Sequence, residues 1–116
     1  MKKFVVLYHA PMDEAAMAAM AAATPEQQAQ GMKAWGDWAQ KTGDKLVEMG
    51  APLMNGQQIS PNGSTANSSK EVSGYSIIQA ENMDEAKAIF NGHPHLNGWN
   101  SNATIEVHEV MPIPGM

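Results

Sequence analysis

The sequence predicts a single α+β domain, residues 1–116, built in the order strand, helix, strand, strand, helix, strand. The length of 116 residues is that of one domain. Stretches with strand character lie at 4–9, 45–54, 70–80 and 103–110. The tetrapeptide MDEA occurs at 12–15 and again at 83–86, each time just after an apolar stretch, which suggests two related halves. Together these features indicate a ferredoxin-like βαββαβ fold with an antiparallel four-stranded sheet.

The first half contains the longest predicted helix. Residues 4–9 form an unbroken apolar and aromatic run that ends in His9. Alanine propensity favours helix over 11–23. Thr24 suits an N-cap and Pro25 the first position of a second helix, which is predicted to end at Gly43. The apolar stripe of that helix holds Met32, Trp35, Trp38 and Ala39.

The second half repeats the pattern after a polar hairpin loop, SPNGSTANSS at 60–69. Asn82 and Glu85 predict a capping box for a helix that ends near residues 91–92. In the last strand Ile105 and Val107 share one face, and the opposite face carries Thr104, Glu106 and His108.

The predicted topology gathers histidines at one end of the sheet. The strands are expected in the order 4-1-3-2, with both helices on one face. His9 ends the first strand, and His93 and His95 precede the fourth strand, so all three should lie at the same end. The 55–69 hairpin loop should reach that end as well.

The other face of the sheet is predicted to need a cover. A strand with one solvated face normally alternates, whereas FVVLY is apolar on both sides. No third helix is available to cover this face. A second copy of the chain is the simplest cover, so we predict a homodimer with its sheets packed together.

Composition narrows the classes of partner. The net charge is −5, and all seven cationic residues are lysines scattered among twelve carboxylates. The absence of arginine argues against nucleic acid and disfavours a strongly anionic ligand. No stretch has the length of a membrane span, the N-terminus does not fit a signal peptide, and cysteine is absent. We therefore expect a soluble, cytoplasmic protein without a membrane partner.

Several longer segments resemble the YCII-related family, also called the DGPF-domain group. These are KKFVVLYHAP, KAWGDWAQK, LVEMGAPL, GYSIIQAENMDEAKAIFNGHPHL and ATIEVHEVMP, which together span almost the whole chain. The resemblance implies a dimeric α+β barrel built on the ferredoxin-like unit. Some relatives are enzymes that act on small cyclic substrates, for instance by removing halide, and others are linked to sigma-factor regulation. Most have no assigned activity.

Two departures limit what the resemblance carries over. The Asp-Gly-Pro-Phe signature is absent, and NSSKEVSGY stands before the third strand instead. The enzyme-like branch of the family uses a histidine on the first helix of the ferredoxin-like unit. In this chain that helix is the one that begins at Pro25, and it has Lys33 and Trp35 in that neighbourhood. A histidine–aspartate dyad therefore does not transfer. What transfers is the location, a pocket at the end of the sheet near the dimer seam.

The candidate catalytic residues are His9, His93, His95 and Glu106. For His93 and His95 three roles remain open: metal ligation together with His9 and Glu106, contact with a substrate, or a structural turn around Pro94. Glu106 is a candidate general base or a seam hydrogen-bonding group, and His108 is expected to pack or hydrogen-bond at the seam. We assign no metal and no cofactor.

Methionine is abundant, and Met17 and Met20 form a group with Met12. Thioether ligation of copper is one interpretation of this group. We instead expect these methionines to fill gaps in the core.

Two hypotheses for function follow. In the first, the protein is an enzyme of the lyase or isomerase kind that acts on a small, weakly charged, cyclic metabolite, with a histidine exchanging a proton and Glu106 assisting. In the second, the same pocket belongs to a non-catalytic ligand-binding or regulatory dimer.

Overall fold

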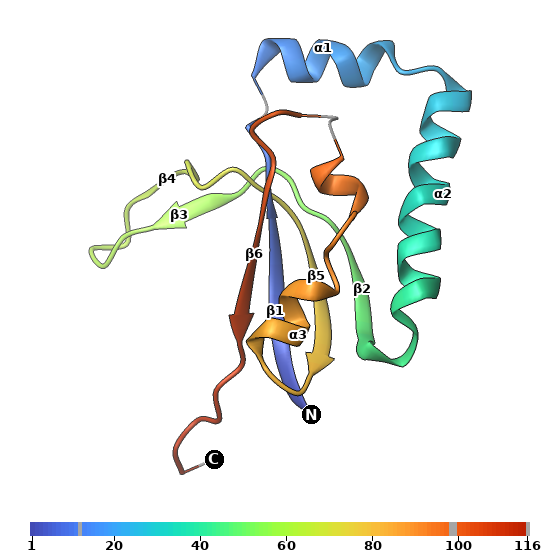
Figure 1. Ribbon diagram of the computed structural model, residues 1–116. Coiled ribbons are helices and arrows are strands. Elements are labelled where there is room, and N and C mark those ends of the chain that lie inside the picture. Colours follow the sequence, from blue (N-terminus) through green and yellow to red (C-terminus); the bar gives the residue numbers. More distant parts are fainter. Residues whose placement is uncertain (12, 98–99, 116) are drawn as a thin grey trace.

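The computed structural model describes residues 1–11, 13–97 and 100–115. Its strands and helices follow the predicted order, with a small extra hairpin, β3–β4, between the second and third main strands (Figure 1). Two 3₁₀ turns, η1 and η2, complete the chain. The elements are β1 (Lys2–His9), α1 (Glu14–Ala22), α2 (Pro25–Thr42), η1 (Gly43–Lys45), β2 (Leu46–Pro52), β3 (Gln57–Ile59), β4 (Thr65–Asn67), β5 (Val72–Ala80), α3 (Met83–Ala88), η2 (Pro94–Leu96) and β6 (Thr104–Glu109).

The main sheet has the predicted topology. Its order is β2-β5-β1-β6, and each neighbouring pair is antiparallel. This is the 4-1-3-2 order of the four main strands, so the ferredoxin-like prediction is confirmed. The register of β1 against β5 shifts between Tyr8 and His9, at the C-terminal end of β1. The irregularity lies beside the predicted cluster of histidines.

The core lies on the face of the sheet that the helices cover. Side chains alternate along a strand, and every second residue is buried from Phe4 to Tyr8 in β1 and from Gly74 to Ala80 in β5. The buried cluster is completed by residues from α2, α3 and the segment after α3, and its members are Phe4, Val6, Tyr8, Trp38, Ile78, Ala80, Ala86 and Phe90. The Trp38 Nε1–H donates to the carbonyl of Ile89 at 2.9 Å, which ties α2 to the end of α3. Burial of this apolar surface is the main stabilising contribution.

The caps of α2 match the sequence prediction. The Thr24 side chain accepts from the Gln27 N–H at 3.1 Å, and the Gln27 side chain accepts in return from the Thr24 N–H at 2.9 Å. Gly43 ends the helix with a φ of 63°, a conformation that glycine adopts without a steric cost. One member of the predicted stripe was placed wrongly. Met32 is 75% exposed, because the stripe that reaches the core narrows to Trp35, Trp38 and Ala39.

The methionine prediction for the first helix was also wrong. α1 forms as expected, with Asp13 as its N-cap, but none of its nine residues is buried. Met17 and Met20 are 59% and 54% exposed, so they do not fill gaps in the core. Met12, the third member of this group, lies outside the described residues. The alanine-rich sequence has a high helix propensity, so the helix forms even though it packs no residue into the core.

The helix predicted to end near residues 91–92, α3, is shorter than the sequence suggests. α3 spans Met83–Ala88, and the Asn82 side chain caps it by accepting from the Glu85 N–H at 2.9 Å. The Glu85 carboxylate binds Lys45 Nζ at 2.6 Å, which links α3 to the end of η1, just before β2. Turns then lead from α3 to η2, of which His93 is the N-cap. Among the described residues, no helix has the length and apolar character needed to cross a bilayer.

The opposite face of the sheet is only half-buried in the protomer. It carries the odd-numbered residues of β1 and β5, whose apolar members are Val5, Leu7, Tyr75 and Ile77. We call this the open face. Glu48 at one edge accepts a hydrogen bond from the Tyr75 hydroxyl at 2.6 Å, and this bond raises the Tyr75 pKa. At the other edge, β6 presents Glu106 and His108 on the same face.

Candidate functional site

The four histidines divide between the two faces of the sheet. His9, His93 and His95 do lie at the same end, as predicted, and His95 Nε2–H donates to the His9 carbonyl at 3.0 Å. The imidazole of His9, however, points to the open face, while His93 and His95 are buried on the helix side. The reason is the alternation of β1, which puts Tyr8 in the core and His9 on the opposite side.

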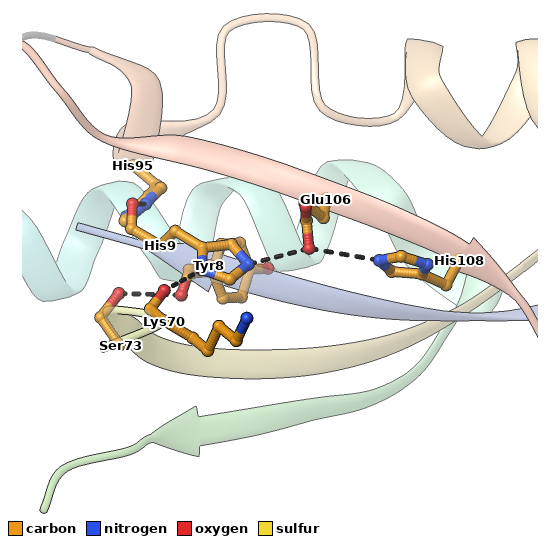
Figure 2. Close-up of polar contacts among 7 residues, drawn as sticks. All are labelled: Tyr8, His9, Lys70, Ser73, His95, Glu106 and His108. Carbon is orange, nitrogen blue, oxygen red and sulfur yellow. Dashed lines mark hydrogen bonds and ion pairs between the residues drawn. The ribbon is translucent and has the colours of Figure 1, made fainter. Parts of the chain in front are cut away.

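His9 is held by both of its ring nitrogens (Figure 2). Nδ1 lies 2.8 Å from the Lys70 carbonyl, and because a carbonyl oxygen only accepts, Nδ1 carries a proton and donates it. Nε2 lies 2.9 Å from Glu106 Oε1. The Lys70 carbonyl on Nδ1 fixes the ring orientation and leaves Nε2 as the nitrogen that faces Glu106. The His9 side chain is 18% exposed, which leaves it within reach of solvent.

Glu106 stands between two imidazoles. The same oxygen, Oε1, lies 3.3 Å from His108 Nε2, which comes from the same strand two residues later. Hydrogen bonds from His108 and from His9 lower the Glu106 pKa, so the carboxylate is ionised at neutral pH. The side chains of Glu106 and His108 are 54% and 61% exposed in the protomer. This His9–Glu106–His108 row is therefore an accessible chain of ionisable groups.

His93 occupies an aromatic cage on the helix side. Its ring centroid lies 4.5 Å from those of Trp35 and Trp38, 5.3 Å from that of Tyr8 and 5.6 Å from that of Phe90. The residue is 0% exposed. Two of these contacts are edge-on, which is a favourable arrangement for aromatic rings. In the protomer, His93 is enclosed on the side away from the open face.

The hydrogen bonds of His93 fix its charge state. The His95 backbone N–H donates to His93 Nδ1 at 3.0 Å, so this nitrogen must keep its lone pair and the proton of the neutral ring sits on Nε2. The Nε2 atom finds no hydrogen-bond acceptor among the described residues. Burial, and to a lesser extent the neighbouring His95, lower the His93 pKa to about 4. His93 is therefore a neutral imidazole at ordinary pH, and it serves as the cap of η2.

The same geometry bears on the metal interpretation. Within residues 1–11, 13–97 and 100–115, no three histidine or carboxylate side chains are placed to share a metal ion. His93 Nδ1 is occupied by a backbone N–H, and the sheet separates His93 from Glu106. The metal set of His9, His93, His95 and Glu106 is not assembled in this arrangement.

The sequence profile of the YCII-related domain matches residues 2–114. The chain belongs to the YCII-related family. No match was found among curated proteins.

Within this YCII-related domain, Trp35 lies on α2 and faces the core. Its ring packs edge-on against Tyr8, with centroids 5.1 Å apart, and against His93. The region is consequently a packed aromatic cluster here. Burial raises the Tyr8 pKa to about 12, and the Tyr8 hydroxyl lies 2.7 Å from Ser76 Oγ inside this cluster.

The sequence of this YCII-related chain did not predict two of the hydrogen-bonding groups around His9 and Glu106 on the open face. The first is the Lys70 carbonyl, a backbone group that no residue pattern could have indicated. The second is His108 as a partner of Glu106 within the same protomer, which the shared face of positions 106 and 108 could have suggested. Lys70 is presented by a bend in which Glu71 has a φ of 59° and its carbonyl accepts from the Ala10 N–H.

Proposed function

We propose that this YCII-related protein binds a small, weakly charged, cyclic metabolite at the His9 end of the open face and exchanges a proton with it through His9. The observation that carries this proposal is the pair formed by His9 Nε2 and Glu106 Oε1 at 2.9 Å, with Nδ1 anchored on a backbone carbonyl. With Nδ1 fixed on a backbone carbonyl, Nε2 is the ring nitrogen that a ligand could reach for general acid–base chemistry.

The division of the histidines supports assigning the chemistry to His9 and Glu106. A group that transfers a proton must come within about 3 Å of the reacting atom. His93 and His95 are both buried, and burial lowers the pKa of each, more weakly for His95 because it donates to backbone carbonyls. We propose that these two hold the end of the sheet together while His9 and Glu106 meet the ligand.

The surroundings support a ligand of low charge. The open face next to His9 is apolar at Leu7 and Tyr75. A hollow of about 440 Å³ lies just beyond the end of β1, within the size range of small-molecule sites. The described residues that line it include no cation, and they are Ala10, Pro11, Asp13, Ser68, Ser69 and Glu71. Hydroxyl and carboxylate groups there favour a ligand that donates hydrogen bonds over one that carries a negative charge.

A ligand screen tests this function. We expect some neutral cyclic metabolites to raise the thermal unfolding temperature of the wild-type protein. Their affinity should fall about tenfold or more in Glu106→Gln, because a hydrogen bond to a charged group is lost. Glu109→Gln is the matched control, since Glu109 lies on the same strand but pairs with Lys2. Equal binding by Glu106→Gln and wild type would remove Glu106 from the site.

A second measurement separates the two hypotheses for function. Each ligand from the screen is incubated with the protein in D₂O and followed by NMR for deuterium incorporation at carbon. Enzyme-dependent incorporation that is lost in Glu106→Gln supports proton transfer. Binding without incorporation or conversion supports the alternative, a non-catalytic ligand-binding or regulatory dimer.

We also propose that a second copy of the chain covers the open face. Val5, Leu7, Tyr75 and Ile77 leave a half-buried apolar surface at the centre of a four-stranded sheet, which is a suitable seam for a two-fold dimer. Such packing would bring the His9–Glu106 pair out of bulk water, where its electrostatic interactions are stronger.

The expected result in sedimentation experiments is a dimer for the wild type. Leu7→Asp should shift the protein to monomer, because a carboxylate there is desolvated in the seam and lies directly opposite Glu106, its cross-strand neighbour on β6. Met32→Lys, on the exposed side of α2, should remain dimeric. A monomeric wild-type protein at micromolar concentration would contradict the proposed dimer.

A further inference from the structure

The Glu106 carboxylate is in the way of the chemistry proposed for His9. The Lys70 carbonyl occupies Nδ1, so Nε2 is the ring nitrogen that remains for a ligand. Glu106 Oε1 already lies against Nε2 at 2.9 Å. A ligand that exchanges a proton with His9 must therefore displace this oxygen, and the displaced carboxylate needs another partner.

His108 is placed to receive the carboxylate. Its Nε2 lies 3.3 Å from the same Oε1 atom, on the side away from His9 (Figure 2). In the protomer His108 and Glu106 are both more than half exposed, so within the chain a small rotation of the Glu106 side chain meets no packing barrier. His9, in contrast, is fixed at both nitrogens and is largely covered. The mobile member of the row is Glu106.

We infer that His108 is a positioning residue, which shares the Glu106 carboxylate and draws it off His9 Nε2 so that the ligand can reach this nitrogen. This role rests on the proposed function, because it matters only if His9 is the proton-exchanging group. His108 itself need not touch the ligand. Glu106 then alternates between shielding His9 in the empty site and pairing with His108 in the occupied one.

The inference can be tested without a ligand by using diethyl pyrocarbonate as the probe. An unprotonated, unshielded imidazole nitrogen attacks one carbonyl carbon of the reagent, an N–C bond forms and the bond to the leaving ethyl carbonate breaks. The other ring nitrogen releases its proton to solvent, and ethyl carbonate takes up a proton and breaks down to ethanol and CO₂. Digestion after lysine gives a peptide of residues 4–33 in which His9 is the only histidine. The rate of carbethoxylation of this peptide measures how often Nε2 is free of Glu106.

Three variants make the measurement specific. Glu106→Ala removes the shield and should speed the reaction at His9 about threefold, as expected for losing one shared hydrogen bond. His108→Leu leaves the carboxylate on His9 and should slow the reaction by about the same factor. His108→Gln keeps an N–H that can hold Glu106 and should restore a rate near that of the wild type. The buried His93 and His95 should stay unlabelled in each folded variant.

The outcomes divide cleanly. The rate order Glu106→Ala, then wild type and His108→Gln, then His108→Leu supports the positioning role. A wild-type or faster rate in His108→Leu, an unchanged rate in Glu106→Ala, or equal slowing by both His108 variants overturns it. In that case a ligand whose binding still depends on Glu106 would leave the proposed function standing, so the two failures can be told apart.

Discussion

Replacing His93 by alanine is expected to lower the free energy of unfolding by about 4 kcal/mol, the cost of deleting a large buried aromatic side chain. The ring is 0% exposed and contacts Tyr8, Trp35, Trp38 and Phe90, so its removal leaves a cavity among rigid neighbours. The change also removes the acceptor of the His95 N–H. Urea unfolding followed by tryptophan fluorescence measures the loss.

The matched control for this variant is His108→Ala. His108 is exposed on β6, and its replacement should change the unfolding free energy by less than about 0.5 kcal/mol. If His93→Ala were as mild as His108→Ala, the aromatic cage could not be a stabilising element. In that case the reason for assigning His93 a structural role would disappear.

The second large effect is a loss of stability in acid. The His93 pKa is about 4 in the folded protein and about 6.5 in the unfolded chain, so between these values the unfolded state binds more protons. Stability is therefore fully present above about pH 6.5 and falls as the pH decreases toward 4. A difference of this size corresponds to about 3 kcal/mol. Urea unfolding measured at intervals from pH 7.5 to pH 4 gives the slope.

His93→Asn isolates this contribution. An asparagine side chain can accept from the His95 N–H as an N-cap, but it does not titrate. The variant should be less stable at pH 7.5 and should lose most of the pH dependence between 6.5 and 4, and the part that remains comes from His95, whose pKa is also lowered by burial. The lowered pKa of Glu106 adds acid sensitivity only below about pH 4.5, outside most of this window. An unchanged slope in His93→Asn would show that another group carries the acid response.

The fold was predictable because its signals are local. The cap at Thr24, the end at Gly43 and the apolar runs of β1 and β5 each depend on neighbouring residues, and all of them agree with the observed elements. The strand order followed from the two-halves pattern and the rules of connection. These parts of the prediction needed no knowledge of contacts distant in the sequence.

The candidate site was predictable in place but not in detail. Connectivity brought His9, His93 and His95 to one end of the sheet, yet the face that each one occupies depends on the parity of β1 and on the turn at Pro94. Whether an imidazole is solvated or enclosed depends on packing between residues more than 50 positions apart, such as Trp35 and His93. Composition likewise could not show that the methionines of α1 lie on the surface.

The alternation at Tyr8 and His9 limits which amino-acid substitutions the two faces of the sheet can accept. The sheet acts as a partition between a dry compartment on one side and a wet compartment on the other, and two consecutive residues of β1 serve opposite compartments. A slip of a single residue in the pairing of β1 would drive the imidazole into the interior and the phenol into solvent. Substitutions that retune the wet side can therefore accumulate without disturbing the dry one, provided that this short stretch of β1 keeps its alignment.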